Sequence, residues 1–208
     1  MLIVATALSL PDQAQSRFDG QANDAPVPEA DEVLLRRYQR GDEDSFRTLF
    51  ARHRAPLLRF VTRLSPAGEA EEIVQDTWLA VIRGRGRFAQ KSLFKTYLYA
   101  IARRRVADRW RKSGHIGFSD QAPEEFAIAP KQHEPEQLTQ NEELGRDLIA
   151  ALDRLPVLQR EAFLLRAEAG LSLDEIAEVT GSNRETAKSR LRFALQRLRG
   201  LLDAWYEG

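Results

Sequence analysis

The chain contains no cysteine, one methionine and three histidines in 208 residues. Without cysteine it cannot form a disulfide, a thiolate zinc site, an iron–sulfur cluster or a cysteine nucleophile. No apolar run approaches the roughly 18 residues that a membrane span needs, so we predict a cytoplasmic protein that does not insert into a membrane. No segment has the pattern of a β-strand either. These absences favour an all-α chain.

The net charge is zero, with 31 basic and 31 acidic residues, but the two signs are separated along the chain. Residues 83–112 hold 11 basic residues and one acidic residue, and residues 184–199 hold six basic residues and one acidic residue. Two concentrated basic stretches in a neutral chain indicate two separate contacts with a polyanion. Two solvated helix faces are the alternative that charge alone leaves open.

Proline, glycine and the hydrophobic periodicity divide the chain into four segments. Residues 1–30 carry a net charge of −3 and lack the basic start of a signal peptide, so we expect a flexible leader. Residues 31–112 have helical periodicity, and so do residues 141–208. Between them, residues 113–140 carry a net charge of −4, three prolines and two glycines, which is typical of a linker. The sequence therefore predicts two small all-helical domains joined by a flexible linker.

The last part of the chain has the pattern of a helix-turn-helix. Ser172 and Glu175 fit the capping box S-x-x-E, which predicts a helix beginning at Leu173. Ser182 and Glu185 fit a second box, and Gly181 between the two helices can adopt the positive φ that a tight turn needs. Two capped helices joined by a glycine turn are typical of this DNA-binding motif.

The second of these helices has two distinct faces. Its inward positions are apolar: Ala187, Leu191, Ala194, Leu198 and Leu202. Its outward positions are mostly polar or basic, as a helix that reads the major groove requires. The candidate DNA contacts on this face are Arg184, Glu185, Lys188, Ser189 and Arg192. An ordinary amphipathic helix with a basic outer face is the alternative.

The predicted helix at residues 70–82 differs, because its outward face is not basic. Its core stripe comprises Ala70, Ile73, Val74, Thr77, Trp78, Val81 and Ile82. Its opposite face comprises Glu72, Gln75, Asp76 and Leu79. An acidic row with an exposed leucine indicates a protein-docking face, and a plain solvated face is the alternative. A metal site would need further ligands, which the neighbouring sequence does not supply, so we predict no metal and no cofactor.

Residues 83–112 combine bases with aromatic side chains, the combination that single-strand binders use. Gly84 and Gly86 predict a loop that enters a helix, with Tyr99 and Trp110 facing the core beside Val106. The candidate contacts with an unpaired strand are Phe88, Lys91, Lys95, Tyr97, Arg104, Arg105, Asp108 and Arg111.

Four stretches together resemble the two domains of an extracytoplasmic-function (ECF) sigma factor, in the sigma-70 family of bacterial RNA polymerase. They are Gly41-Asp42 with Ser45-Phe46, AEEIVQDTWL at residues 70–79, FKTYLYAIARRRVADRWRK at residues 94–112, and LPVLQREAFLLRAEAGLSLDEIAEVTGSNRETAKSRLRFALQRLR at residues 155–199. The resemblance covers residues 31–112, which resemble region 2, and residues 155–201, which resemble region 4.

The resemblance implies a specificity subunit that directs promoter-specific transcription initiation and catalyses nothing itself, in a stress or envelope response. It implies that Glu72 to Leu79 dock on the β′ clamp helices of core polymerase. It also implies that the segment from Phe88 reads and captures the −10 strand and that the helix from Arg184 reads the −35 element. Family members are commonly held inactive by an anti-sigma factor, which would be a further partner besides core polymerase and promoter DNA.

Two positions depart from the family pattern. Arg104 stands where the family often has asparagine, which affects −10 base preference. Phe193 stands where the family often has a basic residue, which shifts the −35 contacts toward Lys188, Ser189 and Arg192. The alternative reading is a helix-turn-helix regulator with an N-terminal sensor domain. A nucleic-acid enzyme would need clustered acids or a positioned nucleophile, and the sequence shows neither.

Overall fold

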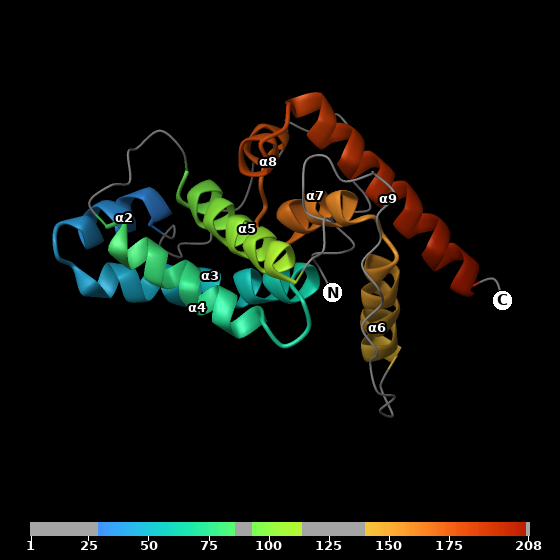
Figure 1. Ribbon diagram of the computed structural model, residues 1–208, viewed down its shortest axis with the longest axis horizontal. Helices are drawn as coiled ribbons and strands as arrows, with labels where there is room; N and C mark the ends of the chain where they lie inside the picture. The colour runs from blue at the N-terminus through green and yellow to red at the C-terminus, as the bar shows by residue number, and fades with distance from the viewer. Residues whose placement is uncertain (1–28, 86–92, 114–139, 207–208) are drawn as a thin grey trace, which may run out of the picture.

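The computed structural model describes residues 29–85, 93–113 and 140–206, and in these residues every regular element is an α-helix (Figure 1). The N-terminal half (residues 29–113) consists of α2 (Asp31–Gln39), α3 (Glu43–Leu64), α4 (Ala70–Arg83) and α5 (Phe94–Lys112). The C-terminal half (residues 140–206) consists of α6 (Gln140–Asp153), α7 (Val157–Ala167), α8 (Leu173–Thr180) and α9 (Arg184–Tyr206). The all-α prediction is confirmed. None of these helices is long and apolar enough to span a bilayer.

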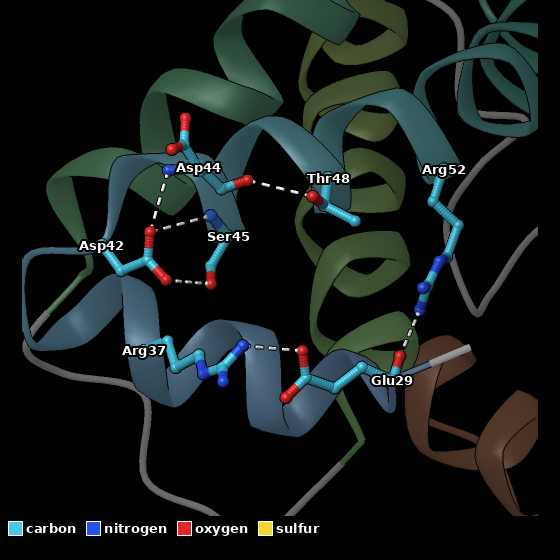
Figure 2. Close-up of polar contacts among 7 residues, drawn as sticks. All are labelled: Glu29, Arg37, Asp42, Asp44, Ser45, Thr48 and Arg52. Atoms are coloured by element: carbon cyan, nitrogen blue, oxygen red, sulfur yellow. Dashed lines mark hydrogen bonds and ion pairs between the residues drawn. The ribbon is translucent and has the colours of Figure 1, made fainter. Parts of the chain in front are cut away.

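A side-chain cap starts the long helix α3. Gly41 has a φ of +109°, which ends the preceding turn, and Asp42 follows it as the N-cap residue. The Asp42 carboxylate accepts hydrogen bonds from the backbone N–H of Asp44 at 3.1 Å and of Ser45 at 3.3 Å, and from the Ser45 hydroxyl at 2.7 Å (Figure 2). These bonds satisfy donors that the first turn of a helix leaves free. Gly41 and Asp42 therefore fix where α3 begins.

Aromatic rings hold the N-terminal half together. The ring centroid of Phe46 on α3 lies 5.8 Å from that of Trp78 on α4, in an edge-to-face contact. It lies 4.8 Å from the ring centroid of Tyr38 on α2. The predicted core stripe of α4 is buried from Ile73 to Val81. Ile82 departs from that prediction, because it is 41% exposed in the last turn of the helix.

A buried polar contact joins α2 to α3. His53 Nε2 lies 2.7 Å from Asp31 Oδ2, and Arg52 bonds to the other carboxylate oxygen. Burial alone would raise the pKa of Asp31, but the hydrogen bonds and charges of His53 and Arg52 outweigh burial and lower it. His53 is thus a buried structural residue.

Arg160 is a buried charged residue of the C-terminal half, with 1% of its surface exposed. Its guanidinium donates to the side chain of Asp153 at 3.3 Å, and to the backbone carbonyls of Asp153 at 2.6 Å and Leu155 at 3.2 Å. These acceptors lie at the junction of α6 and α7, where Pro156 stands as N-cap residue. Burial lowers the pKa of Arg160 to about 10, so the guanidinium is still charged at neutral pH and needs these partners.

The two halves pack against each other. In Figure 1, α5 lies between the other N-terminal helices and the pair α7 and α8, and α5 contacts α8 directly. Helix α3 also contacts α7. The buried apolar side chains of both halves form one contiguous cluster. The segments that the sequence separates by a linker therefore share a core in this structure.

We predict that Asp153→Ala lowers the free energy of unfolding by about 3 kcal/mol, because it leaves the charge of Arg160 buried without its counter-ion. Urea unfolding followed by circular dichroism measures the change. Arg47→Ala is the control, since it breaks only an exposed ion pair with Asp44 and should change stability by less than about 0.5 kcal/mol. Equal losses in the two variants would contradict a stabilising role for the Arg160 network.

Candidate nucleic-acid interface and docking face

The first helix of the predicted helix-turn-helix begins at the predicted residue and has the predicted cap. Helix α8 begins at Leu173, and Ser172 and Glu175 make both bonds of the capping box, at 2.8 and 3.3 Å. Gly181 has a φ of +69°, so the turn uses the backbone freedom expected of glycine. Helix α9 begins at Arg184, so three residues (181–183) separate the two helices.

The second predicted capping box is wrong by one residue. The N-cap contact of α9 comes from Asn183, whose side-chain oxygen accepts from the backbone N–H of Thr186 at 2.7 Å. The backbone N–H of Ser182 is already bonded to the carbonyl of Ala177 at 3.0 Å, because it closes the C-terminal end of α8. Ser182 therefore belongs to the end of the preceding helix. Asparagine directly before a predicted helix is also a capping signal, so the sequence contained the correct answer.

The outward face of α9 carries the predicted DNA contacts. Arg184, Glu185, Lys188 and Arg192 are exposed, whereas Ser189 is half-buried and bonds to its own helix. Arg184 Nε lies 3.0 Å from a carboxylate oxygen of Asp174 on α8.

Long basic side chains dominate this exposed face. The Arg192 guanidinium lies 4.9 Å from the ring of Phe193, which is 38% exposed and places an apolar surface at the edge of the basic face. Lys188 and Arg192 can donate to base edges, and the first turn of α9 can hold a phosphate.

The predicted strand-binding residues on α5 fall into two groups. Lys95 faces the C-terminal half, where its Nζ donates to the carbonyl of Ala169 at 3.2 Å. Tyr97 is half-buried, burial raises its pKa, and its hydroxyl oxygen lies 2.8 Å from where a Cβ on Gly84 would stand. Arg104 is exposed. Phe88 and Lys91 lie outside the described residues.

The second group lines an open cavity of about 400 Å³ between α4 and α5. Its lining residues are Asp76, Arg105, Asp108, Arg109, Arg111 and Lys112. Asp108 is bonded to Arg111 one turn later, so it orients that base instead of offering a free acid. Two of the four basic side chains around this cavity, Arg109 and Arg111, already make ion pairs with carboxylates, so the cavity offers Arg105 and Lys112 to a phosphate.

The predicted docking face on α4 is only partly free. Glu72 and Gln75 are exposed, and Asp76 and Leu79 are half-buried. Arg109 on α5 donates two hydrogen bonds to Glu72, at 2.6 and 3.2 Å.

The same guanidinium lies 3.4 Å from Glu69 and 3.5 Å from Asp76. Hydrogen bonding to Arg109 lowers the pKa of Glu72, and the same bond raises the pKa of Arg109. Arg109 was not among the predicted docking residues, because its pairing depends on how α4 and α5 pack. Since Asp76 also lines the cavity, the docking face and the basic part of α5 are adjacent.

No group of three or more histidine, aspartate or glutamate side chains is placed to hold a metal ion in the part of the chain that the structure describes.

Comparison with known proteins identifies the family. The description "Sigma-70 region 2" matches residues 49–116, and "Sigma-70, region 4" matches residues 145–198. The RNA polymerase sigma factor CarQ of Myxococcus xanthus is 32% identical over 169 residues, which cover 81% of this chain and 95% of CarQ. The ECF RNA polymerase sigma-E factor of Escherichia coli (strain K12) is 30% identical over 168 residues, which cover 77% of this chain and 88% of that protein.

Solved structures agree with this result. The sigma factor RpoE of Bartonella quintana, in complex with the anti-sigma factor NepR, has a TM-score of 0.58 and 30% identity, and the match covers 76% of this chain and 96% of RpoE. CnrH, in complex with the cytosolic domain of CnrY, shares the fold with a TM-score of 0.61 at 24% identity, covering 85% of this chain and 99% of CnrH. The chain belongs to the sigma-70 family of RNA polymerase sigma factors, and within that family to the ECF sigma factors. A regulator with an N-terminal sensor is not favoured, because region 2 accounts for the first half.

We predict that Asn183→Ala lowers the free energy of unfolding by about 1 kcal/mol and increases amide hydrogen exchange in the first turn of α9, because it removes the cap. Ser182→Ala is the matched control and should have the smaller effect on that turn. A larger effect of Ser182→Ala would restore the second capping box.

Proposed function

We propose that this transcription initiation factor directs core polymerase to its promoters through three surfaces of one chain, without catalysis of its own. Helix α9 reads duplex DNA at the −35 element, α5 with the segment before it holds the unpaired −10 strand, and the α4 face docks on the β′ clamp helices. The observation that carries the proposal is the presence of two outward-facing basic helices, on separate halves, beside an acidic face.

The role of α9 follows from its exposed donors. Lys188 and Arg192 would donate to guanine O6 and N7 in the major groove, while Arg184 and the first turn of α9 hold the DNA backbone. Phe193 would contribute an apolar contact, for which a thymine methyl group is the suitable partner.

The role of α5 is to retain DNA that has already opened. Arg104, Arg105 and Arg111 would follow the phosphates, and Tyr97 and Phe88 would stack on unpaired bases. Each surface is small, so the linker must supply effective concentration for both to bind one promoter. Strand opening then draws on binding free energy rather than on nucleotide hydrolysis.

The proposed function divides the chain into two domains, a linker and a leader. Residues 31–112 form the region 2 domain, residues 113–140 the linker, residues 141–208 the region 4 domain and residues 1–30 the leader. The protein would act in the cytoplasm, where promoter DNA and polymerase are found. Two relatives of known structure are complexes with another protein, NepR for RpoE and the cytosolic domain of CnrY for CnrH. By analogy we infer an anti-sigma partner for this chain.

Transcription in vitro tests the proposal as a whole. Genomic DNA is transcribed by core polymerase with and without the protein, and transcript starts are mapped by sequencing. New, sharply defined starts that depend on the protein are expected. If none arises above core polymerase alone, the proposed function is wrong.

We predict that Lys188→Ala and Arg192→Ala each weaken binding to the upstream promoter element by about 1–3 kcal/mol, because each removes a base contact. Affinity is measured with the polymerase holoenzyme on promoters found by the mapping. Arg47→Ala removes the same charge from an exposed position on α3 and serves as the control. Wild-type initiation by both α9 variants would disprove the placement of the recognition helix.

We predict that Asp76→Lys weakens binding to core polymerase at least tenfold and leaves the binding of free DNA unchanged or stronger, since it reverses a charge on the docking face. Glu71→Lys makes the same charge change on the same helix, about 140° around the helix axis from Asp76, and should have little effect on polymerase binding. Co-purification and fluorescence titration with core polymerase measure the difference. Equal losses would show that overall charge, and not this face, controls docking.

A further inference from the structure

A carboxylate from α2 holds the start of the helix proposed to bind the unpaired strand. Helix α5 begins at Phe94, and its N-cap residue Leu93 supplies no side-chain cap. Instead, Glu32 on α2 accepts a hydrogen bond from the backbone N–H of Phe94 at 3.0 Å. The neighbouring Asp31 contacts His53 on α3 at 2.7 Å, so the start of α2 is itself fixed. A contact between distant residues thus replaces a local cap and places the first turn of α5.

The other end of α2 holds the residues that follow α4. Arg85 comes directly after Gly84, the C-cap residue of α4, and its guanidinium carbon lies 4.4 Å from the ring centroid of the buried Tyr38 on α2. Its Nη1 lies 3.2 Å from a carboxylate oxygen of Glu43, the first residue of α3. Helix α2 therefore contacts both the residue after α4 and the first residue of α5.

These two contacts converge on Tyr97, in the first turn of α5. A Cβ on Gly84 would lie 2.8 Å from the Tyr97 hydroxyl oxygen, which is closer than such atoms normally come. Gly84 has a φ of −84°, which every residue can adopt, so the close approach and not the backbone conformation requires glycine. Tyr97 is thus placed from one side by the end of α4, and from the other by the capped turn on which it stands.

The contacts of Arg85 add little to stability by themselves. The Arg85 side chain is 33% exposed and that of Glu43 is 62% exposed, and exposed ion pairs contribute little. Phe94 and Leu98 are fully buried and already anchor α5 to the other helices. A ring that stacks on one base, however, must be held in a defined orientation, whereas contacts to phosphates carry no sequence information. Precise placement of Tyr97 therefore matters for reading a base.

We propose that Glu32 and Arg85 are positioning residues for strand capture: they hold Tyr97 from two sides so that its ring meets one unpaired base of the −10 strand. This inference rests on the proposed function of α5. Neither residue touches DNA. Arg104 and Arg105 still bind phosphates when Tyr97 is displaced, so the loss of either positioning contact lowers affinity for the base and leaves affinity for the backbone.

Binding of the polymerase holoenzyme to single strands separates the base contact from the backbone contacts. The probes are a fluorescein-labelled −10 single strand from a promoter found by start-site mapping, and copies in which one base at a time is replaced by an abasic site. The ratio of the affinities for the intact and abasic strands measures each base contact, because the phosphates are the same. The position whose ratio is lost in Tyr97→Ala identifies the base that this ring meets.

At that position, Glu32→Ala and Arg85→Ala should each reduce the ratio by about fivefold or more, since stacking of one base on an aromatic ring is worth at least that factor. Glu32→Gln should retain the ratio, because its amide oxygen can still accept from the backbone N–H of Phe94. Arg83→Ala removes the same charge as Arg85→Ala from an exposed position two residues earlier and should retain the ratio too. Affinity for the abasic strand should be alike in the two arginine variants. Thermal unfolding checks that every variant is folded.

A double substitution tests the close approach at Gly84. Gly84→Ala should displace the Tyr97 ring and reduce the ratio as strongly as Arg85→Ala does. In a Tyr97→Phe background, which lacks the hydroxyl, the same substitution should reduce the ratio less than about twofold. The added Cβ also lies 3.0 Å from the carbonyl oxygen of Ala80 in both backgrounds, so that contact cancels in the comparison.

The outcomes separate the inference from the proposed function. If the parent holoenzyme binds the intact strand and every abasic strand equally, α5 makes no base contact and its proposed function fails. If the parent discriminates but no position responds to Tyr97→Ala, this ring is not the contact and the inference is wrong. It is also wrong if either Glu32→Ala or Arg85→Ala keeps the parent ratio, or weakens binding to the intact and abasic strands alike. Equal effects of Gly84→Ala in both backgrounds would contradict the placement of Tyr97 by the end of α4.

Discussion

The burial of one guanidinium determines how the C-terminal half meets the rest of the chain. Arg160 binds carbonyls at the junction of α6 and α7 and one carbonyl of the other half, so the junction and the interface depend on the same side chain. Its neighbour Glu161 then points toward α5. Because a buried charge is costly without partners, the bonds of Arg160 to the carbonyls of Asp153 and Leu155 favour the observed junction of α6 and α7. The surface that α7 presents follows from this constraint.

Helix α5 must satisfy three environments at once. Phe94, Leu98 and Val106 fill the core, Lys95 and Arg103 meet the C-terminal half, and the bases near Lys112 line the open cavity. A helix that packs on one side needs one apolar stripe, whereas a helix that meets three environments has polar and apolar residues around its whole circumference. This explains why its sequence mixes aromatics and arginines without a simple period. It also explains how Arg109 on α5 comes to pair with the acidic side chains of α4.

Features set by local chemistry could be predicted from the sequence. The capping box at Ser172, the turn at Gly181 and the two faces of α9 each depend on residues within a few positions of one another. Features set by packing could not. The pairing of Arg109 with Glu72 and the contact of Arg103 with Glu161 join residues far apart in sequence, and periodicity carries no information on which helices become neighbours. Ser182 shows a third case, in which two adjacent residues both fit a cap and the preceding helix decides between them.

The pairing of Arg103 with Glu161 has a consequence for how such proteins diversify. A charge on one half is matched by a charge on the other, so a substitution on either half changes this contact. A chimera that joins this N-terminal half to the DNA-reading half of another family member would inherit whichever residue that member has opposite Arg103. Such a hybrid would keep or lose the ion pair between the halves according to that one residue.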